Sequence, residues 1–185
     1  MTTQKPYKMI EDFITGQKVP EVGSEENRQM VERFLVEEKG YNKTDIEVDA
    51  DITVMFDGKP YHSNVNLVVS VEGTKFMAIK CPAGSLESWE REILAAARVL
   101  EEDYQIPFSV VCDGSEAVVF DTCSGKHIAT GMDAIFSKKK AGEKLREIEL
   151  KPLPEKIRKR EHIIFRSYDL ENVNVRRHII SEAES

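Results

Sequence analysis

Residues 57–97 constrain the fold of this chain more than any other stretch, because turns, strands and a helix follow one another there in a fixed order. Two runs rich in β-branched and apolar residues predict strands at residues 64–71 and 75–81. Gly, Asp and Pro bound these runs and predict turns at residues 57–59, 72–74 and 82–84. A helix is predicted over residues 85–104, opened by Ser85.

Side-chain alternation then decides which residues of the two strands can meet. Asn66 shares a face of the first strand with Val68, and Ala78 shares a face of the second strand with Lys80. If the two strands pair as a hairpin, Asn66 approaches Ala78 and Lys80 across the sheet.

In this arrangement the stretch resembles the N-terminal nuclease domain of type I restriction enzyme R subunits, a branch of the PD-(D/E)XK nuclease fold. That family carries an Asp in one strand, Glu-x-Lys in the next, and then a turn and a helix. Here Asn66 stands at the Asp position and Ala78 at the Glu position, while Lys80 matches. Related nucleases also carry Gln-x-x-x-Tyr on the helix, where this chain has Glu92 and Ala96.

The resemblance covers residues of about 24–130, from a Glu-rich helix start to a closing hairpin whose first strand ends in Asp113-Gly114. It implies an α/β fold with a restriction-endonuclease-like core (α-β-β-β-α-β, a mixed sheet flanked by helices) and a C-terminal extension. We accordingly divide the chain into an N-terminal helix and linker, a restriction-endonuclease-like domain and a basic C-terminal extension, at residues 1–23, 24–137 and 138–185.

The resemblance also implies Mg²⁺-dependent cleavage of phosphodiester bonds, and the substitutions bear directly on that chemistry. Mg²⁺ prefers charged oxygen ligands, and the Lys stabilises the attacking water or the developing charge. Asn66 offers a neutral carbonyl oxygen and Ala78 offers no ligand. We therefore expect no cofactor, and Mg²⁺ only if the protein is active. Acids at the starts of two helices could replace the lost ligands, although a helix dipole also favours acids there: Glu25, Glu26, Glu87 and Glu90.

Apolar spacing predicts the remaining elements near the motif. A short amphipathic helix is expected at residues 7–14, ended by Gly16, and a longer helix capped by Ser24 is expected up to Gly40. Clean alternation over residues 46–56 predicts a strand with one buried face. In the helix after the motif, Leu86, Trp89, Ile93, Ala97 and Leu100 form the apolar face, and Glu87, Glu90, Glu92 and Arg98 mark the polar one.

Charge is distributed unevenly along the chain, whose net charge is −7. Residues 1–137 hold 13 Lys and Arg against 24 Asp and Glu, whereas residues 138–177 hold 13 against 7. A basic segment after an acidic body fits a solvated helical tail, or an arm that contacts phosphates or docks a partner. The candidates for nucleic-acid contact are Lys138, Lys139, Lys140, Arg158, Lys159 and Arg160.

Cys81, Cys112 and Cys123 lie far apart and form no Cys-x-x-Cys motif. This spacing argues against a zinc site and favours a reducing compartment, so we expect three buried thiols and a cytoplasmic protein. No apolar run approaches the ~20 residues that span a bilayer, and the N-terminus lacks an apolar signal segment. We therefore expect no membrane association.

Three functions remain open from the sequence. The leading one is a stand-alone nuclease-fold module, with no motor domain following, which binds DNA or a restriction-modification subunit and whose cleavage is lost or weakened. The second is an active Mg²⁺-dependent DNA endonuclease that uses a displaced carboxylate. The third is a non-enzymatic protein-interaction domain. The sequence pattern does not specify an oligomeric state.

Overall fold

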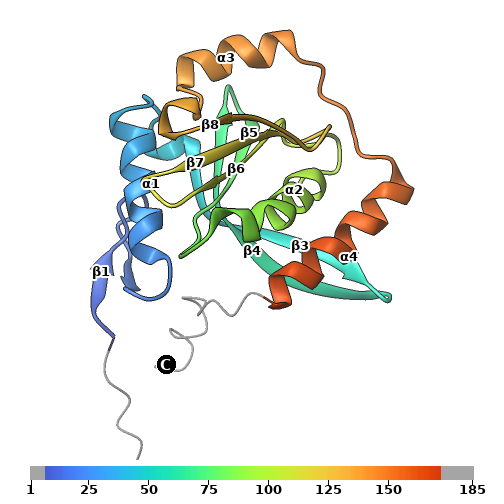
Figure 1. Cartoon of the computed structure of the whole chain (residues 1–185), viewed down its shortest axis with the longest axis horizontal. Helices are drawn as coiled ribbons and strands as arrows, with labels where there is room; N and C mark the ends of the chain where they lie inside the picture. Colours follow the sequence, from blue (N-terminus) through green and yellow to red (C-terminus); the bar gives the residue numbers. More distant parts are fainter. Residues whose placement is uncertain (1–6, 172–185) are drawn as a thin grey trace, which may run out of the picture.

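A mixed sheet of six strands organises the protein in the computed structural model, which describes residues 7–171 (Figure 1). The strands follow the order β3-β4-β5-β6-β7-β8, so each pairs with its neighbours in the sequence. They are β3 (Ile46–Phe56), β4 (Lys59–Val71), β5 (Thr74–Lys80), β6 (Phe108–Cys112), β7 (Ala117–Asp121) and β8 (Lys126–Thr130).

Helices lie against this sheet in the described part of the chain. The α-helices are α1 (Glu25–Glu37), α2 (Glu90–Val99), α3 (Lys138–Glu147) and α4 (Glu155–Glu171). Short 3-10 helices precede β3, α2 and α3, at Lys43–Asp45, Leu86–Trp89 and Met132–Ala134. Among residues 7–171 no helix is long and apolar enough to cross a membrane.

The topology follows from the turns and the crossover. Strands β3, β4 and β5 form the antiparallel meander that the turn residues predict. The chain then passes through α2 and returns as β6, which runs parallel to β5. A parallel neighbour requires such a crossover, because a tight turn only reverses the strand direction. Strands β7 and β8 complete the sheet in antiparallel pairing. The predicted α/β fold, with a mixed sheet flanked by helices, is confirmed.

The sheet separates two hydrophobic cores. Leu35 of α1 and Ala141 of α3 are buried in the first core, and Ile93 of α2 and Phe165 of α4 are buried in the second. Strands β5 and β6 contribute to both cores. Their sequences are therefore almost continuously apolar rather than alternating.

The β3–β4 hairpin passes from one core to the other part-way along its length. Val48 packs against the first core and Ala50 lies in the second, although strict alternation would put both on one face. Asp49 between them has a left-handed φ of 52°. The alternation of buried and exposed residues predicted over residues 46–56 is confirmed, but the buried side chains pack against two cores rather than one, because the strand changes conformation at Asp49.

Residues 7–20 form a two-stranded ribbon, so the helix predicted at residues 7–14 is wrong. β1 (Met9–Glu11) pairs antiparallel with β2 (Lys18–Pro20). The Asp12 carboxylate accepts hydrogen bonds from the backbone N–H groups of Ile14 (3.1 Å) and Thr15 (2.7 Å). A side chain that satisfies these donors stabilises a turn in competition with a helix.

The helix predicted over residues 85–104 is shorter in the structure, where α2 ends at Val99. Its apolar face is confirmed, since Trp89, Ile93 and Ala97 lie in the second core. The polar face was predicted wrongly at Glu92, which is buried. An ion pair with the neighbouring strand explains this burial, as described below.

The basic segment after residue 137 packs onto the sheet and helices. Arg158 of α4 donates hydrogen bonds to the carbonyls of Val99 (3.1 Å) and Glu101 (2.7 Å), which lie at and just after the end of α2. It thereby satisfies carbonyls that a helix end leaves without intrahelical partners. The prediction of a solvated tail is wrong for residues 138–171, because α3 and α4 both contribute to the cores.

A buried ion pair fixes α4 to α2. Glu161 of α4 is fully buried. Its Oε1 lies 3.0 Å from Arg91 and 3.2 Å from Arg98, both on α2. A buried carboxylate requires such neutralisation, so this contact orients the two helices.

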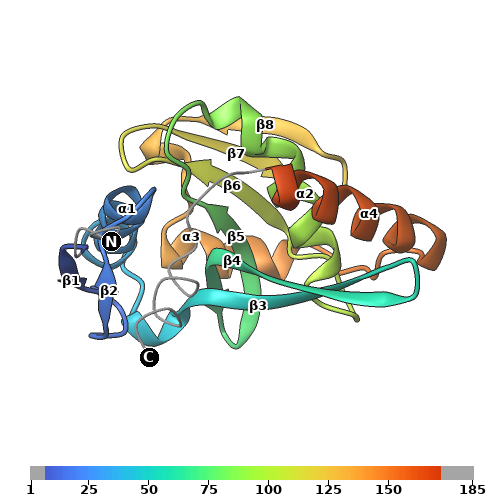
Figure 2. The same cartoon turned by 90° about the horizontal axis from the view of Figure 1, so that it is seen from below.

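Helix α4 also holds the far end of the β3–β4 hairpin, which extends alongside it in Figure 2. His162 Nδ1 accepts a hydrogen bond from the Met55 N–H at 3.1 Å. The Arg166 guanidinium lies 3.9 Å from the centre of the Phe56 ring. These contacts join two segments more than 100 residues apart in the sequence.

The cysteines match the prediction at two of three positions. Cys81 and Cys112 are buried, and burial raises the pKa of the Cys112 thiol to about 11. Cys123 is exposed because it lies in the turn between β7 and β8, so the prediction of burial is wrong for this residue.

Replacing Arg158 with Met should lower the free energy of unfolding by about 2 kcal/mol, because several carbonyls lose a charged donor. The matched variant Lys159→Met, at an exposed neighbour on the same helix, should change it by less than about 0.5 kcal/mol. Urea unfolding measures both. Equal losses would contradict the role assigned to Arg158.

Acid should weaken the contact between α4 and the hairpin. Burial and the charge of Arg158 lower the pKa of His162, and Glu155 partly opposes them. The folded state therefore favours the neutral ring, whose contribution to stability is complete above about pH 6.5 and is lost as the pH falls below that value. Between about pH 7.5 and 5.5, the urea midpoint should fall further for the natural chain than for His162→Gln. Equal falls would show that His162 is not responsible.

Candidate functional site

Lys80 ends β5 and directs its ammonium group toward α2. Its Nζ lies 2.6 Å from Glu92 Oε1 and 4.4 Å from the centre of the Trp89 ring. The side chains of Lys80 and Glu92 are 13% and 3% exposed. Buried charges of this kind are stable when they are paired, so Lys80 links β5 to α2.

Asn66 and Ala78 lie where the sequence pattern places them, on the strands beside Lys80. The register pairs Val68 with Ala78, which brings Asn66 to the level of Lys80. Asn66 Oδ1 accepts a hydrogen bond from the Cys81 backbone N–H at 2.8 Å. Ala78 is fully buried in the second core. The amide oxygen of Asn66 therefore binds the backbone, and Ala78 supplies only a methyl group.

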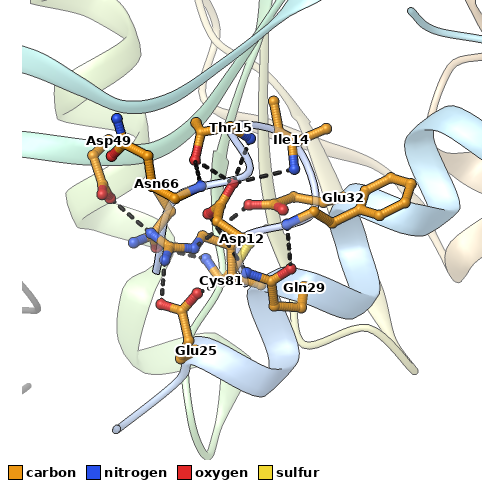
Figure 3. Close-up of polar contacts among 12 residues, drawn as sticks. Asp12, Ile14, Thr15, Glu25, Gln29, Glu32, Asp49, Asn66 and Cys81 are labelled. Atoms are coloured by element: carbon orange, nitrogen blue, oxygen red, sulfur yellow. Dashed lines mark hydrogen bonds and ion pairs between the residues drawn. The ribbon is translucent and has the colours of Figure 1, made fainter. Parts of the chain in front are cut away.

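Arg28 of α1 binds a group of acids. Figure 3 shows these acids, Glu25, Glu32 and Asp49, near Asn66 and Cys81. Nη1 donates a hydrogen bond to Asp49 Oδ1 at 2.7 Å, and Nη2 donates another to Glu25. Glu32 Oε1 lies 3.6 Å from Nε. Burial opposes the charge of Arg28, but the hydrogen bond to Glu25 and the charges of the three acids raise its pKa.

The N-terminal ribbon joins the same network through Gln29. Gln29 Nε2 donates a hydrogen bond to Glu25 Oε1 at 2.9 Å and lies 3.5 Å from Asp12 Oδ2. Gln29 Oε1 accepts a hydrogen bond from the Phe13 N–H at 2.8 Å. Residues before α1 are therefore connected to the acids around Arg28.

Cys81 lies between this network and Lys80. Burial raises the pKa of its thiol, and the charges of Arg28, Glu32 and Lys80 all act on it. Figure 3 shows Cys81 near Asn66 and the acids of the Arg28 network, and Cys81 directly follows Lys80 in the sequence.

The four acids predicted as replacement ligands have different surroundings. Glu25 is buried against Arg28, whereas Glu26 is exposed. Glu87 is exposed, and Glu90 is half-buried; burial and the charge of Glu87 raise the pKa of Glu90, while His127 lowers it. The carboxylate that reaches Lys80 comes instead from Glu92.

The six basic candidates also separate by environment. Lys138 forms an ion pair with Asp45 at 2.6 Å, and Arg158 binds carbonyls at the end of α2. Lys159 and Arg160 are exposed and lie 3.8 and 3.7 Å from acids of their own helix. The other two, Lys139 and Lys140, are exposed in the first turn of α3.

The residues at the motif do not fit a magnesium ion. Mg²⁺ needs an octahedral set of oxygen ligands that includes carboxylates. Within residues 7–171, no three His, Cys, Asp or Glu side chains form a group that could hold a metal ion. Asn66 and Ala78 bring no carboxylate, and Glu25 and Asp49 bind Arg28.

Comparison with protein families matches residues 23–135 to the type I restriction enzyme R protein N terminus (HSDR_N). These residues include α1, the meander, α2 and the strands that complete the sheet. The chain belongs to this family. The predicted resemblance to the R N-terminal family is thus confirmed for residues 23–135. No curated protein and no solved structure matches the chain.

Sequence reasoning named Glu25 as a candidate ligand in this R N-terminal domain, but it missed Arg28 and Glu32 and did not predict that Glu92 pairs with Lys80. Glu25, Arg28 and Glu32 are spaced at i, i+3 and i+7, which places them on one face of α1. That spacing was a usable signal for the network. Glu92 had no comparable signal, because its partner Lys80 lies on a strand rather than on the same helix.

Replacing Lys80 with Met should lower the free energy of unfolding by about 3 kcal/mol, because it removes the positive charge beside the buried Glu92 carboxylate. The double variant Lys80→Met/Glu92→Leu should recover part of this loss. Lys126→Met, at an exposed position of β8, should change stability by less than about 0.5 kcal/mol. A double variant that loses the sum of the single effects would exclude coupling. Urea unfolding of the natural chain, the two single variants Lys80→Met and Glu92→Leu, the double variant and Lys126→Met provides the five values.

Proposed function

We propose that this member of the R N-terminal family does not cleave DNA and acts as a nucleic-acid-binding module. The observation that carries the proposal is the buried pair between Lys80 and Glu92, 2.6 Å apart. Lys80, the motif residue that matches the nuclease pattern, therefore forms a contact that stabilises the fold. Its neighbours Asn66 and Ala78 give no support for a bound metal ion.

Loss of cleavage follows from the chemistry of the site. A bound Mg²⁺ ion would supply Lewis acidity and a metal-bound water, and its ligands must be oxygen atoms held in place. Asn66 Oδ1 instead accepts the Cys81 N–H. A catalytic lysine must also reach the developing charge of the substrate, whereas Lys80 contacts Glu92 and Trp89.

Support for nucleic-acid binding comes from a lysine cluster at the start of α3, formed by Lys39, Lys138, Lys139 and Lys140. The Lys138 N–H donates to the Lys39 carbonyl at 2.8 Å, which joins the two segments. Burial lowers the pKa of Lys39, and the charge of Lys140 lowers it further, whereas the charges of Asp133 and Glu38 raise it.

The position of this cluster on α3 increases its positive field. The first turn of α3 contains no acid, and the helix dipole adds positive potential at the same end. Contacts from such lysines to phosphates would position a nucleic acid without reading its sequence.

Glu92 favours a second candidate function, an active endonuclease. It is an acid of α2 beside Lys80, and a carboxylate displaced onto this helix would be the ligand that the strands lack. In that case Mg²⁺ would be required, and Glu92 rather than Glu87 or Glu90 would be the essential acid.

The cellular setting is part of the same proposal. Cys81, Cys112 and Cys123 are free thiols, which supports a reducing compartment. We place the protein in the cytoplasm, where DNA and subunits of restriction-modification systems are available as partners.

The natural chain should bind short duplex DNA, with an affinity that falls steeply as salt rises. Lys139→Ala/Lys140→Ala should weaken binding by about tenfold and reduce the salt slope by about two, because two phosphate contacts are lost. The matched control Lys18→Ala/Lys126→Ala removes the same charge from exposed positions on β2 and β8. Fluorescence anisotropy measures all three proteins.

The natural chain should leave plasmid and single-stranded DNA intact in the presence of Mg²⁺ or Mn²⁺. Cleavage that disappears in both Lys80→Ala and Glu92→Gln would replace our proposal with the second candidate. Absence of DNA binding at low salt would exclude the nucleic-acid role and leave a protein partner, such as a restriction-modification subunit, as the ligand to identify.

A further inference from the structure

A small pocket lies where the far end of the β3–β4 hairpin meets α4. Its volume is about 320 Å³, at the lower end of the range of about 300–1,000 Å³ that small-ligand pockets occupy. Figure 2 shows this end of the hairpin beside α4, and Figure 1 shows α3, which carries the lysine cluster, on another part of the molecule. The residues that line the pocket are Phe56, Asp57, Lys59, Pro60, Tyr61 and Arg166.

The hairpin turn and a tyrosine hold the walls of this pocket in place. Asp57 and Gly58 have left-handed φ angles of 49° and 71°, as a tight two-residue hairpin turn requires. Tyr61 Oη donates a hydrogen bond to Asp169 of α4, which ties the second strand of the hairpin to the helix. The walls are therefore ordered before a ligand arrives, which lowers the entropic cost of binding.

Arg166 differs from the arginines that stabilise the fold. Arg98 of α2 lies 3.2 Å from the buried carboxylate of Glu161, whereas the Arg166 guanidinium lies 3.9 Å from the centre of the Phe56 ring. Among residues 7–171, no carboxylate forms an ion pair with Arg166 or with Lys59, the second cation of the pocket. Both cations therefore remain available to an anion.

The chemistry of these walls suits a nucleotide. A base can stack on the rings of Phe56 and Tyr61 or on the plane of the guanidinium. Lys59 and Arg166 can bind a phosphate through charge-assisted hydrogen bonds. The exposed Asp57 carboxylate only accepts hydrogen bonds when it is ionised, so it favours a base that carries an amino group. A simple anion would leave the aromatic walls without a contact.

We infer that this pocket binds one nucleotide, with the base against the aromatic and guanidinium walls and the phosphate held by Lys59 and Arg166. A free nucleoside monophosphate has this chemistry, and so does the end of a single strand that carries a 5′-phosphate. The pocket is separate from the lysine cluster of α3. The inference therefore goes beyond the proposed function and does not depend on it.

Isothermal titration calorimetry of the natural chain with AMP and CMP, whose bases carry an amino group, tests the inference. Each should bind at one saturable site with a dissociation constant below about 1 mM, a modest affinity for ligands of this size. Adenosine and inorganic phosphate should each bind at least about tenfold more weakly, because each supplies only part of the contacts. Inorganic phosphate that binds as tightly as AMP would overturn the inference, as would the absence of a saturable site for both nucleotides.

Two pairs of variants locate the site. Arg166→Gln should weaken AMP binding by about tenfold or more, because it removes a phosphate donor, whereas Arg160→Gln, at an exposed arginine of the same helix, should not. Phe56→Leu should weaken binding by about tenfold through lost stacking. Its control is Phe34→Leu, at another half-buried phenylalanine with a cation over its ring. Equal losses in a pocket variant and its control would contradict the assignment.

Lys59→Gln keeps the test decisive if another pocket variant does not fold, because the Lys59 side chain is exposed. It should weaken AMP binding by about threefold to tenfold, since one phosphate contact is lost. Unchanged AMP affinity in Lys59→Gln would exclude the phosphate position that we assign.

Competition against AMP identifies the source of the nucleotide. Displacement of AMP by a single-stranded oligonucleotide with a 5′-phosphate, but not by the same strand with a 5′-hydroxyl, would assign the pocket to a strand end. If neither strand displaces AMP, the ligand is the free nucleotide. If both strands displace it, the pocket accepts a nucleotide within a strand.

The Lys139→Ala/Lys140→Ala variant separates this inference from the proposed function. It should bind AMP as tightly as the natural chain does, because its substitutions lie outside the pocket. Duplex DNA binding without AMP binding in the natural chain would refute the inference alone. AMP binding without duplex DNA binding would refute the proposed function alone.

Discussion

Burial of charge is the constraint on which this structure depends. Three buried acids, Glu32, Glu92 and Glu161, each lie beside a cation, and each ion pair links or orders elements of the fold. Because an acid buried without an opposite charge would cost several kcal/mol, a partner on another element fixes the position of the helix that carries the acid. The Lys80–Glu92 pair joins β5 to α2, and the pairs of Glu161 join α2 to α4.

The same constraint accounts for the contacts made around Asn66, Ala78 and Lys80. In the family pattern, acids on two strands would hold a metal ion that neutralises them. In this chain those strand positions carry an amide and a methyl group, and the nearby acids are neutralised by Arg28. Asn66 binds the backbone of Cys81, and Glu25 and Asp49 bind Arg28, so these polar groups stabilise the fold.

The C-terminal segment shows how charge alone can mislead. Its basic composition fits a solvated tail, yet Arg158 binds carbonyls at the end of α2 and Phe165 is buried in the second core. The long β3–β4 hairpin would have an open edge at β3, and α4 packs along it. Covering an edge strand in this way also limits unwanted strand pairing.

The sequence by itself determined the order of the elements. Gly, Asp and Pro at the turns and β-branched runs between them specified the meander, and the spacing of Trp89, Ile93 and Ala97 specified the buried face of α2. These signals act between near neighbours in the chain. The ribbon at residues 7–20 was not predicted, because the apolar spacing there is typical of a helix. The Asp12 carboxylate instead stabilises a turn by accepting hydrogen bonds from two backbone N–H groups.

Only the tertiary structure decided which charges neutralise one another. Arg28 meets Asp49 from another element, and Arg91 meets Glu161 70 residues away. Composition and periodicity do not predict such distant pairs, because two charges come into contact only when the sheet and the helices pack together. The sequence therefore determined which residues stand at the motif positions, and the fold determined that Glu92 pairs with Lys80 and that Arg28 pairs with Asp49 nearby.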